Sequence, residues 1–206
     1  DNGIKFFGPD GYKLSDSAEL EIEALVSKGI GCVPPEDIGR AKRIDDGRYR
    51  YIERVKSSFP NQMRLDGLKV VIDCANGAGY KAAPEVLWEL GAEVIPVGVS
   101  PDGRNINLDC GSTNPTVAAE TVVAHAADVA ICLDGDADRV LIIDEFGRPI
   151  DGDQFLGMIG SRWFKNGNLV ENTLVSTVMS NMGLEAFLKQ EGIKLVRTSV
   201  GDRYVV

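Results

Sequence analysis

The sequence predicts an α/β protein made of repeated strand–helix–strand units with mixed sheets. An apolar, β-branched run at 68–73 is followed by a glycine-rich turn, a helix-like stretch and a second apolar strand. The same order recurs from residue 173, about 105 residues further along the chain. Because parallel strands need a long crossover, usually a helix, each unit predicts a parallel pair of strands. A hairpin pattern at 140–150 adds antiparallel strands to the first sheet.

The first part of the chain lacks this order. Residues 4–7 are expected to form a short strand. A helix is expected at about 15–27, because Ser15 or the aspartate after it can cap a stretch with an apolar stripe. Glycine and proline are frequent at 28–47, which is typical of a linker. A further helix is expected at 48–58.

The repeated units occupy the rest of the chain. Residues 68–73 and 92–96 are the first pair of strands, and 80–90 is the helix between them. The turn at 76–79 is similar to a phosphate-cradling turn at a helix N-terminus, but it lacks the G-x-G-x-x-G spacing, so tight strand-to-helix packing is expected. The remaining elements follow from the same periodicity: helices at 116–126, 153–164 and 182–190, and strands at 128–133, 140–144, 148–150, 173–178 and 193–197.

Composition excludes several classes of protein. Hydrophobic residues make up 44% of the 206 residues, enough for a folded core, so general disorder is excluded. Acidic residues outnumber basic ones by 31 to 22 and no basic run is present, which argues against binding to nucleic acid or to an anionic membrane. No apolar run approaches the roughly 18 residues of a membrane span, and the N-terminus has no signal-peptide pattern. A cytoplasmic location is therefore expected.

The four cysteines are far apart and form no C-x-x-C pair. We expect buried free thiols in a reducing compartment. The chain has a single histidine, so a zinc site is not expected. The chain also lacks an initiator methionine, and its second α/β unit is interrupted at Val206, which favours a fragment of a longer protein.

The most informative segment follows the predicted strand at 128–133. Three aspartates stand at alternate positions, Asp134, Asp136 and Asp138. In an extended chain such residues share one face roughly 6.6 Å apart, and Gly135 permits a bend that brings the carboxylates together. A hard divalent cation such as Mg²⁺ or Ca²⁺ would relieve their repulsion. Since ligands collect at the carboxyl ends of strands in open α/β sheets, these residues predict a metal site.

Two other interpretations of this loop stay open. In a calcium-binding EF-hand, the three aspartates match positions 1, 3 and 5 and Glu145 matches position 12, but Arg139 stands where glycine is needed and strand-like runs flank the loop. In an aspartyl-phosphate phosphatase, Asp134 would be the nucleophile and Asp136 the acid or base. That chemistry requires a lysine and a second acidic pair downstream. The acidic pair at 151 and 153 comes too soon in the chain to serve.

The loop and several other segments resemble one known family. The run Asp134-Gly135-Asp136-Ala137-Asp138-Arg139 is similar to the metal-binding loop of the α-D-phosphohexomutase superfamily. Within that superfamily, essentially the whole chain resembles the bacterial phosphoglucosamine mutases. The residues that carry this resemblance are 1–7, 71–79, 105–107, 110–112, 178–184, 197–198 and 200–205.

The resemblance implies an isomerase that interconverts glucosamine-6-phosphate and glucosamine-1-phosphate through a phosphoserine and a bisphosphate intermediate, for the synthesis of cell-wall amino-sugar nucleotides. It implies Mg²⁺ at the three aspartates, and Arg139, Asp202 and Arg203 as catalytic residues. Arg139 has a fixed fork of donors that suits a phosphate. The implied partners are a phosphosugar and its bisphosphate, without nucleic acid or membrane, and pairing as a homodimer is left open.

The resemblance also implies an incomplete set of domains. Residues 1–45 would be the tail of the first family domain, 46–166 the second domain with the metal loop, and 167–206 the start of the third. The family's T-x-S-H-N-P-like serine loop is not among the 206 residues, nor are its sugar-recognition loop and its fourth domain. The chain is therefore expected to be truncated at both ends and inactive by itself.

Overall fold

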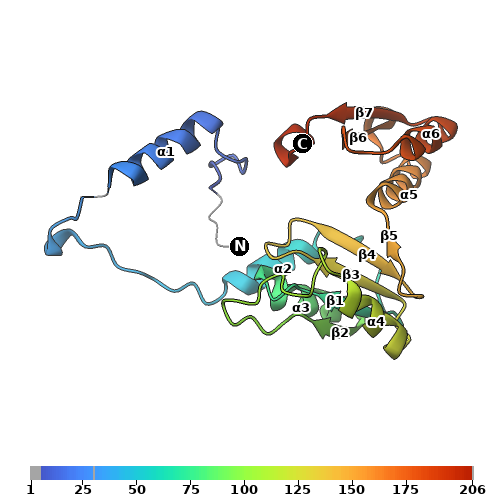
Figure 1. The fold of residues 1–206 in the computed structure, drawn as a ribbon, viewed down its shortest axis with the longest axis horizontal. Coiled ribbons are helices and arrows are strands. Elements are labelled where there is room, and N and C mark those ends of the chain that lie inside the picture. Colours follow the sequence, from blue (N-terminus) through green and yellow to red (C-terminus); the bar gives the residue numbers. More distant parts are fainter. Residues whose placement is uncertain (1–5, 30, 206) are drawn as a thin grey trace. The chain divides into compact units, whose positions relative to one another are not determined.

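The computed structural model describes residues 6–29 and 31–205, without the side chains of Asp202 and Arg203 (Figure 1). The chain divides into two units, Asp1–Asp45 and Asp46–Val206. The first unit contains helix α1 (Asp16–Lys28) and the 3₁₀ turn η1 (Pro35–Asp37). The strand expected at 4–7 begins outside the described residues, and Phe7 forms an isolated antiparallel bridge with Lys13.

Helix α1 confirms the helix predicted near the N-terminus. The Ser15 Oγ accepts a hydrogen bond from the Ala18 N–H at 3.3 Å, which satisfies one of the backbone donors left open at a helix start. None of the helix residues is buried. The apolar stripe that predicted this helix therefore lies exposed in the described residues.

The second unit contains a five-stranded mixed sheet with strand order β2-β1-β3-β4-β5. Its strands are β1 (Lys69–Asp73), β2 (Glu93–Val97), β3 (Val129–Leu133), β4 (Val140–Asp144) and β5 (Pro149–Ile150). The three strands β2, β1 and β3 are parallel, whereas β4 and β5 continue as the antiparallel hairpin. The predicted mixed α/β sheet is confirmed.

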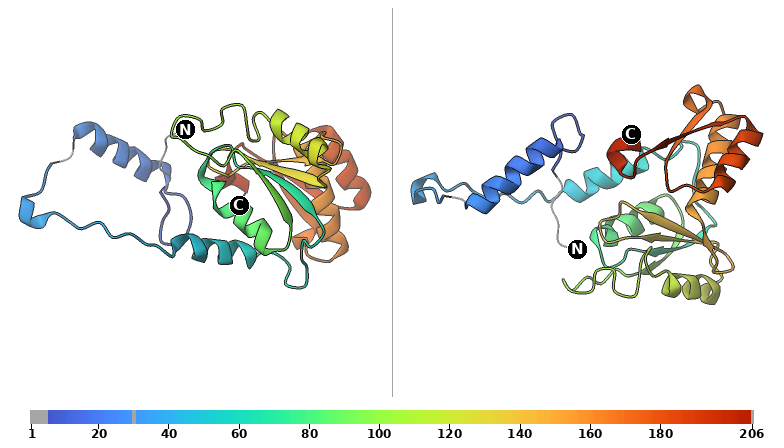
Figure 2. Two further views of the ribbon diagram at one scale, coloured as in Figure 1. Left: turned by 90° about the horizontal axis from the view of Figure 1, so that it is seen from below. Right: turned by 45° about the horizontal axis from the view of Figure 1, so that its top comes forward.

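Helices cover both faces of this sheet (Figure 2). On one face, helix α4 (Thr116–His125) contributes Ala118 and Val122 to a buried cluster with Val71 of β1 and Ile143 of β4. On the other face, helices α2 (Gly47–Lys56) and α3 (Ala82–Glu89) pack together beside Ile72 of β1. Neighbouring residues of β1 thus point to opposite cores, as period-two alternation requires. A short 3₁₀ turn, η2 (Ala78–Tyr80), lies at the end of the expected glycine-rich turn, and α3 begins two residues after the expected helix start at 80.

A second, smaller sheet consists of the parallel strands β6 (Thr173–Thr177) and β7 (Lys194–Thr198). Helices α5 (Gly152–Lys165) and α6 (Met182–Glu191) pack against each other, and the core beside them contains Leu174, Leu188 and Ile193. The turn η3 (Val170–Asn172) precedes β6, and α7 (Asp202–Val205) follows β7. This confirms the second strand–helix–strand unit. Helix α5 precedes that unit in sequence and packs with it.

Among the described helices, none combines the length and the apolar character that crossing a bilayer requires.

Three of the four cysteines are buried as expected, but Cys32 is exposed. Burial raises the pKa of Cys74 and of Cys132 to about 12 and also raises that of Cys110. Since the thiolate is the reactive species, a thiol of pKa about 12 is roughly one part in 10,000 ionised at pH 8. We expect one fast-reacting thiol in a titration with a chromogenic disulfide at pH 8, and four in denaturant. A second fast thiol in the folded chain would contradict the buried placement.

Candidate metal centre

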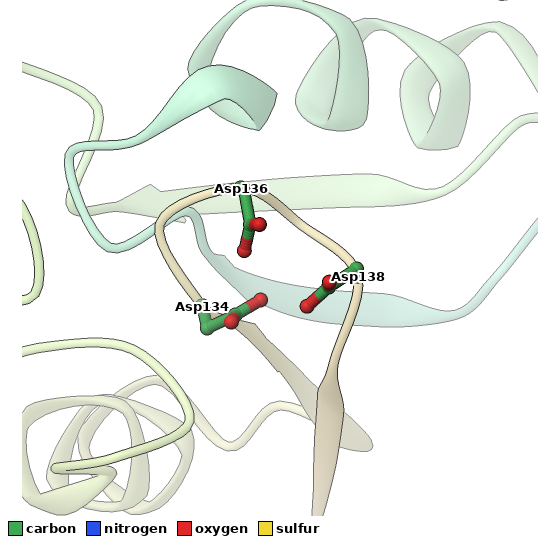
Figure 3. Close-up of side chains that lie close together, drawn as sticks. All are labelled: Asp134, Asp136 and Asp138. Atoms are coloured by element: carbon green, nitrogen blue, oxygen red, sulfur yellow. The ribbon is translucent and has the colours of Figure 1, made fainter. Parts of the chain in front are cut away.

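The three aspartates lie in the turn that joins β3 to β4 (Figure 3). One carboxylate oxygen from each of Asp134, Asp136 and Asp138 lies within 4.8 Å of the other two. Asp134 is buried with 1% of its surface exposed, whereas the other two aspartates are exposed. Converging carboxylate oxygens are the donors that a hard divalent cation prefers, so the donor set fits Mg²⁺ or Ca²⁺. The predicted proximity of these side chains is present in the structure.

A tight turn at residues 134–137 brings the carboxylates together. Ala137, rather than Gly135, adopts the left-handed conformation, with φ of 60°. The Ala137 N–H donates to the Asp134 carbonyl at 3.1 Å and closes the turn. Gly135 and Asp136 are the central residues of the turn that this hydrogen bond closes, so Gly135 takes part in the bend as expected, and it also lies against the segment at 105–107. Gly135 allows this close approach, because a Cβ there would lie 2.6 Å from the Ile106 Cδ1, and that side chain would have to shift.

Arg139 binds the buried aspartate directly. Its Nε and Nη2 both lie 2.7 Å from the Asp134 Oδ2, and its backbone N–H donates to Oδ1 at 3.1 Å. This hydrogen bond to Asp134 is the largest cause that raises the pKa of Arg139, which therefore stays cationic. Two of the five guanidinium N–H groups are engaged in this way. The guanidinium is largely exposed, so its other donors face the solvent side of the loop.

The structure argues against the calcium interpretation. Strands β3 and β4 flank the loop in place of two helices. Glu145 follows β4, whose five residues span about 17 Å at 3.3–3.4 Å per residue. The carboxylate that an EF-hand needs at position 12 is thus at the far end of a strand from Asp138. The loop does not have the compact twelve-residue form of an EF-hand.

Two predicted catalytic residues fall outside the part of the chain whose side chains are described. Asp202 and Arg203 begin helix α7, and no side-chain geometry is assigned to either. The described residues therefore place Arg139 at the metal loop and leave these two as sequence-based candidates.

One functional candidate was missed in the sequence. Asp73 ends strand β1, beside Cys132 of β3 in the sheet register, and none of its surface is exposed. Its Oδ1 accepts from the Ala75 N–H at 2.9 Å and its Oδ2 accepts from the Gly111 N–H at 2.7 Å. The only local sign of a role for this residue was its position, as an acidic residue that directly follows the apolar residues of β1. Its partner at 111 is 38 positions away and could not be inferred from spacing.

Comparison with protein families gives two matches along the chain. Residues 49–147 match the profile for phosphoglucomutase/phosphomannomutase, alpha/beta/alpha domain II. Residues 151–206 match the profile for phosphoglucomutase/phosphomannomutase, alpha/beta/alpha domain III. Together these matches cover well over half of the chain.

Individual proteins are similar over the whole chain. The phosphoglucosamine mutase of Roseobacter denitrificans is 70% identical over 206 residues, which are all of this chain and 46% of that protein. The phosphoglucosamine mutase of Ruegeria sp. (strain TM1040) is 69% identical with the same coverage. The chain thus spans about half the length of these relatives. A putative phosphomannomutase from Thermus thermophilus, of known structure, shares the fold with a TM-score of 0.70 at 22% identity, over 93% of this chain and 44% of that one.

Proposed function

The chain belongs to the phosphoglucomutase/phosphomannomutase family, and from this membership we propose that it forms the metal-binding part of a phosphoglucosamine mutase. The proposed reaction interconverts glucosamine-6-phosphate and glucosamine-1-phosphate by way of a phosphoserine and a bisphosphate. The identity of about 70% to proteins of that name supports the substrate class. The observation that carries the proposal is the convergence of three carboxylates at the end of β3.

Asp134, Asp136 and Asp138 would hold Mg²⁺, and the donor chemistry of the loop fits that ion. A bound Mg²⁺ supplies charge neutralisation to a transferring phosphoryl group, and phosphoryl transfer depends mostly on positioning and electrostatics. Within the loop, Asp134 is held by Arg139 and by burial, so its carboxylate has a fixed direction. The two exposed aspartates can adjust to complete the coordination.

Arg139 is proposed to bind a phosphate oxygen of the substrate or of the phosphoserine. Its contact with Asp134 fixes the plane of the guanidinium and leaves other N–H donors for a phosphate. Asp202 and Arg203 are proposed to act from the next domain, in proton transfer or phosphate binding, on the strength of the sequence resemblance. The cytoplasm is the proposed location, since the four cysteines are free thiols, which suits a reducing compartment.

Metal binding by the isolated chain tests the proposal. We expect the chain to bind Mn²⁺, a paramagnetic substitute for Mg²⁺, at a single site whose signal Mg²⁺ competes away. Asp134→Asn should abolish this binding, because it removes the charge of the one buried ligand.

Glu145→Gln is the matched control, since it removes an acidic charge from the far end of β4 and should leave Mn²⁺ binding unchanged. Retention of binding with Asp134→Asn would overturn the site, and loss of binding with the control would show that Glu145 is a ligand, as the calcium interpretation requires. Hydrolysis of p-nitrophenyl phosphate that disappears with Asp134→Asn would instead support the phosphatase interpretation.

A further inference from the structure

The geometry points to Asp73 as a positioning residue that holds the backbone of the metal loop through two neighbouring loops. This inference deepens the proposed function, because it concerns the same site. Asp73 touches none of the three proposed ligands through a hydrogen bond among the described contacts. Its two described hydrogen-bond partners are the backbone N–H groups of Ala75 and Gly111, which belong to different loops.

Each of these two loops donates one backbone hydrogen bond to the metal loop, one before Asp134 and the other after it. The Ser112 N–H, next to Gly111, donates to the Leu133 carbonyl at 2.9 Å. The Ala78 N–H, in the turn that begins at Ala75, donates to the Gly135 carbonyl at 2.8 Å. The carbonyls immediately before and after the buried ligand are thus both held, and both holding loops are tied to the one carboxylate of Asp73.

The held segments adopt backbone conformations that need such support. Ala75, Asn76, Asn107 and Asp109 all have positive φ, between 50° and 57°. Residues other than glycine are uncommon in this region and persist there only when the surrounding structure holds them in place. The Asp73 Oδ1 bond to the Ala75 N–H fixes the first of them, and the Asn107 N–H donates to the Ala75 carbonyl at 2.9 Å. The strained backbone is therefore linked to the same carboxylate.

Two glycines pack closely around this carboxylate and the loops that it holds. A Cβ on Gly98 would lie 2.6 Å from the Asp73 Oδ1, and a Cβ on Gly111 would lie 2.6 Å from the Leu133 carbonyl oxygen. A buried carboxylate is costly unless it is hydrogen-bonded, so its two N–H donors and its burial belong together. An amide in its place would turn one acceptor into a donor that faces an N–H group.

The test combines hydrogen exchange with metal binding in Asp73→Asn. In the metal-free chain, the Ala78 and Ser112 amides should exchange at least about tenfold faster, while the sheet amide of Val71 keeps its wild-type rate. The Mn²⁺ dissociation constant should rise roughly 10–100-fold, as it does for other residues that orient metal ligands. The exchange result does not depend on bound metal.

Asp144→Asn is the matched control. The Asp144 Oδ1 also accepts from two backbone N–H groups, those of Phe146 and Arg148, but at the far end of β4. Because both N–H groups bind one oxygen, the amide oxygen of Asn can keep them, so this variant removes an acidic charge and should leave the Ala78 and Ser112 exchange and the Mn²⁺ affinity unchanged. If Asp73→Asn does not fold, the same measurements are made on Asp73→Ser, whose shorter side chain keeps one oxygen acceptor but removes the second, so that at least one of the two amides should still exchange faster than in the wild type.

The two exchange outcomes separate this inference from the proposed function. If Ala78 and Ser112 keep their wild-type exchange, or speed up only as much as Val71, Asp73 has a general structural role and the inference is overturned. If those amides respond but the wild-type chain binds no Mn²⁺, the positioning role stands and the proposed function fails. An unchanged Mn²⁺ affinity in Asp73→Asn, beside a wild type that binds, would also overturn the inference.

Discussion

Alanine at Asp134, Asp136 or Asp138 is expected to lower mutase turnover at least roughly 100-fold, since about 3 kcal/mol or more of charge stabilisation is lost with a metal ligand. The measurement is a coupled assay with glucosamine-6-phosphate and Mg²⁺. It uses a mutase in which this chain replaces the matching segment of the Roseobacter denitrificans protein, to which it is 70% identical. The fold should persist, because removal of one carboxylate also relieves repulsion within the loop.

The three variants should differ in stability. Asp134→Ala leaves Arg139 without its bidentate partner, so this variant should lose more stability than the variants of the two exposed aspartates. Glu145→Gln serves again as the control with unchanged turnover. Near-normal turnover in any one of the three alanine variants, with Mg²⁺ as the only metal, would show that the replaced residue is not a ligand.

The isolated 206-residue chain is expected to show no mutase turnover at any Mg²⁺ concentration. A mutase needs a nucleophile that holds a phosphoryl group between two half-reactions, and the family's serine loop is not among these residues. Without the sugar-binding parts of the relatives, the binding energy that orients a substrate is also missing. The assay is the same coupled reaction with a bisphosphate activator added, and the chimeric mutase is the positive control.

One serine of the chain makes this prediction sharper. Ser112 lies beside the metal loop, since its N–H is bonded to the Leu133 carbonyl. It begins a Ser-Thr-Asn-Pro run that superficially resembles the family's serine loop. Turnover by the isolated chain that disappears with Ser112→Ala would contradict the assignment of the phosphoserine to a segment outside this chain. Turnover that survives this change but not Asp134→Asn would favour the phosphatase interpretation.

Local patterns predicted the elements and the composition of the site. Period-two alternation and apolar runs located the strands, and the hairpin after the metal loop followed from its turn residues. The three aspartates were found because alternate positions after a buried strand share one edge of the sheet. Each of these inferences depends on residues that are close together in the sequence.

The arrangement of the site depends on contacts between distant segments, which spacing does not reveal. The left-handed conformation of Ala137 and the close approach of Gly135 to residues 105–107 both depend on how the folded loops meet. Arg139 was expected to face a phosphate, but in the structure it binds Asp134. The sequence could not reveal this pairing, because it does not show which of the three aspartates is buried. The role of Asp73 could not be predicted from the sequence, because it depends on a hydrogen bond to Gly111, which is 38 positions away in the chain.

Gly77 cannot be replaced by a residue with a side chain while its own loop and the metal loop keep their present contact. A Cβ at that position would lie 2.1 Å from the carbonyl oxygen of Gly135. Because the obstacle is backbone, no second substitution can make room for it, and the two loops would have to separate. Any lineage or directed-evolution library that keeps this loop must therefore keep a residue without a side chain at 77. Such experiments can vary the proposed metal ligands through the exposed Asp136 and Asp138, but they cannot vary this position.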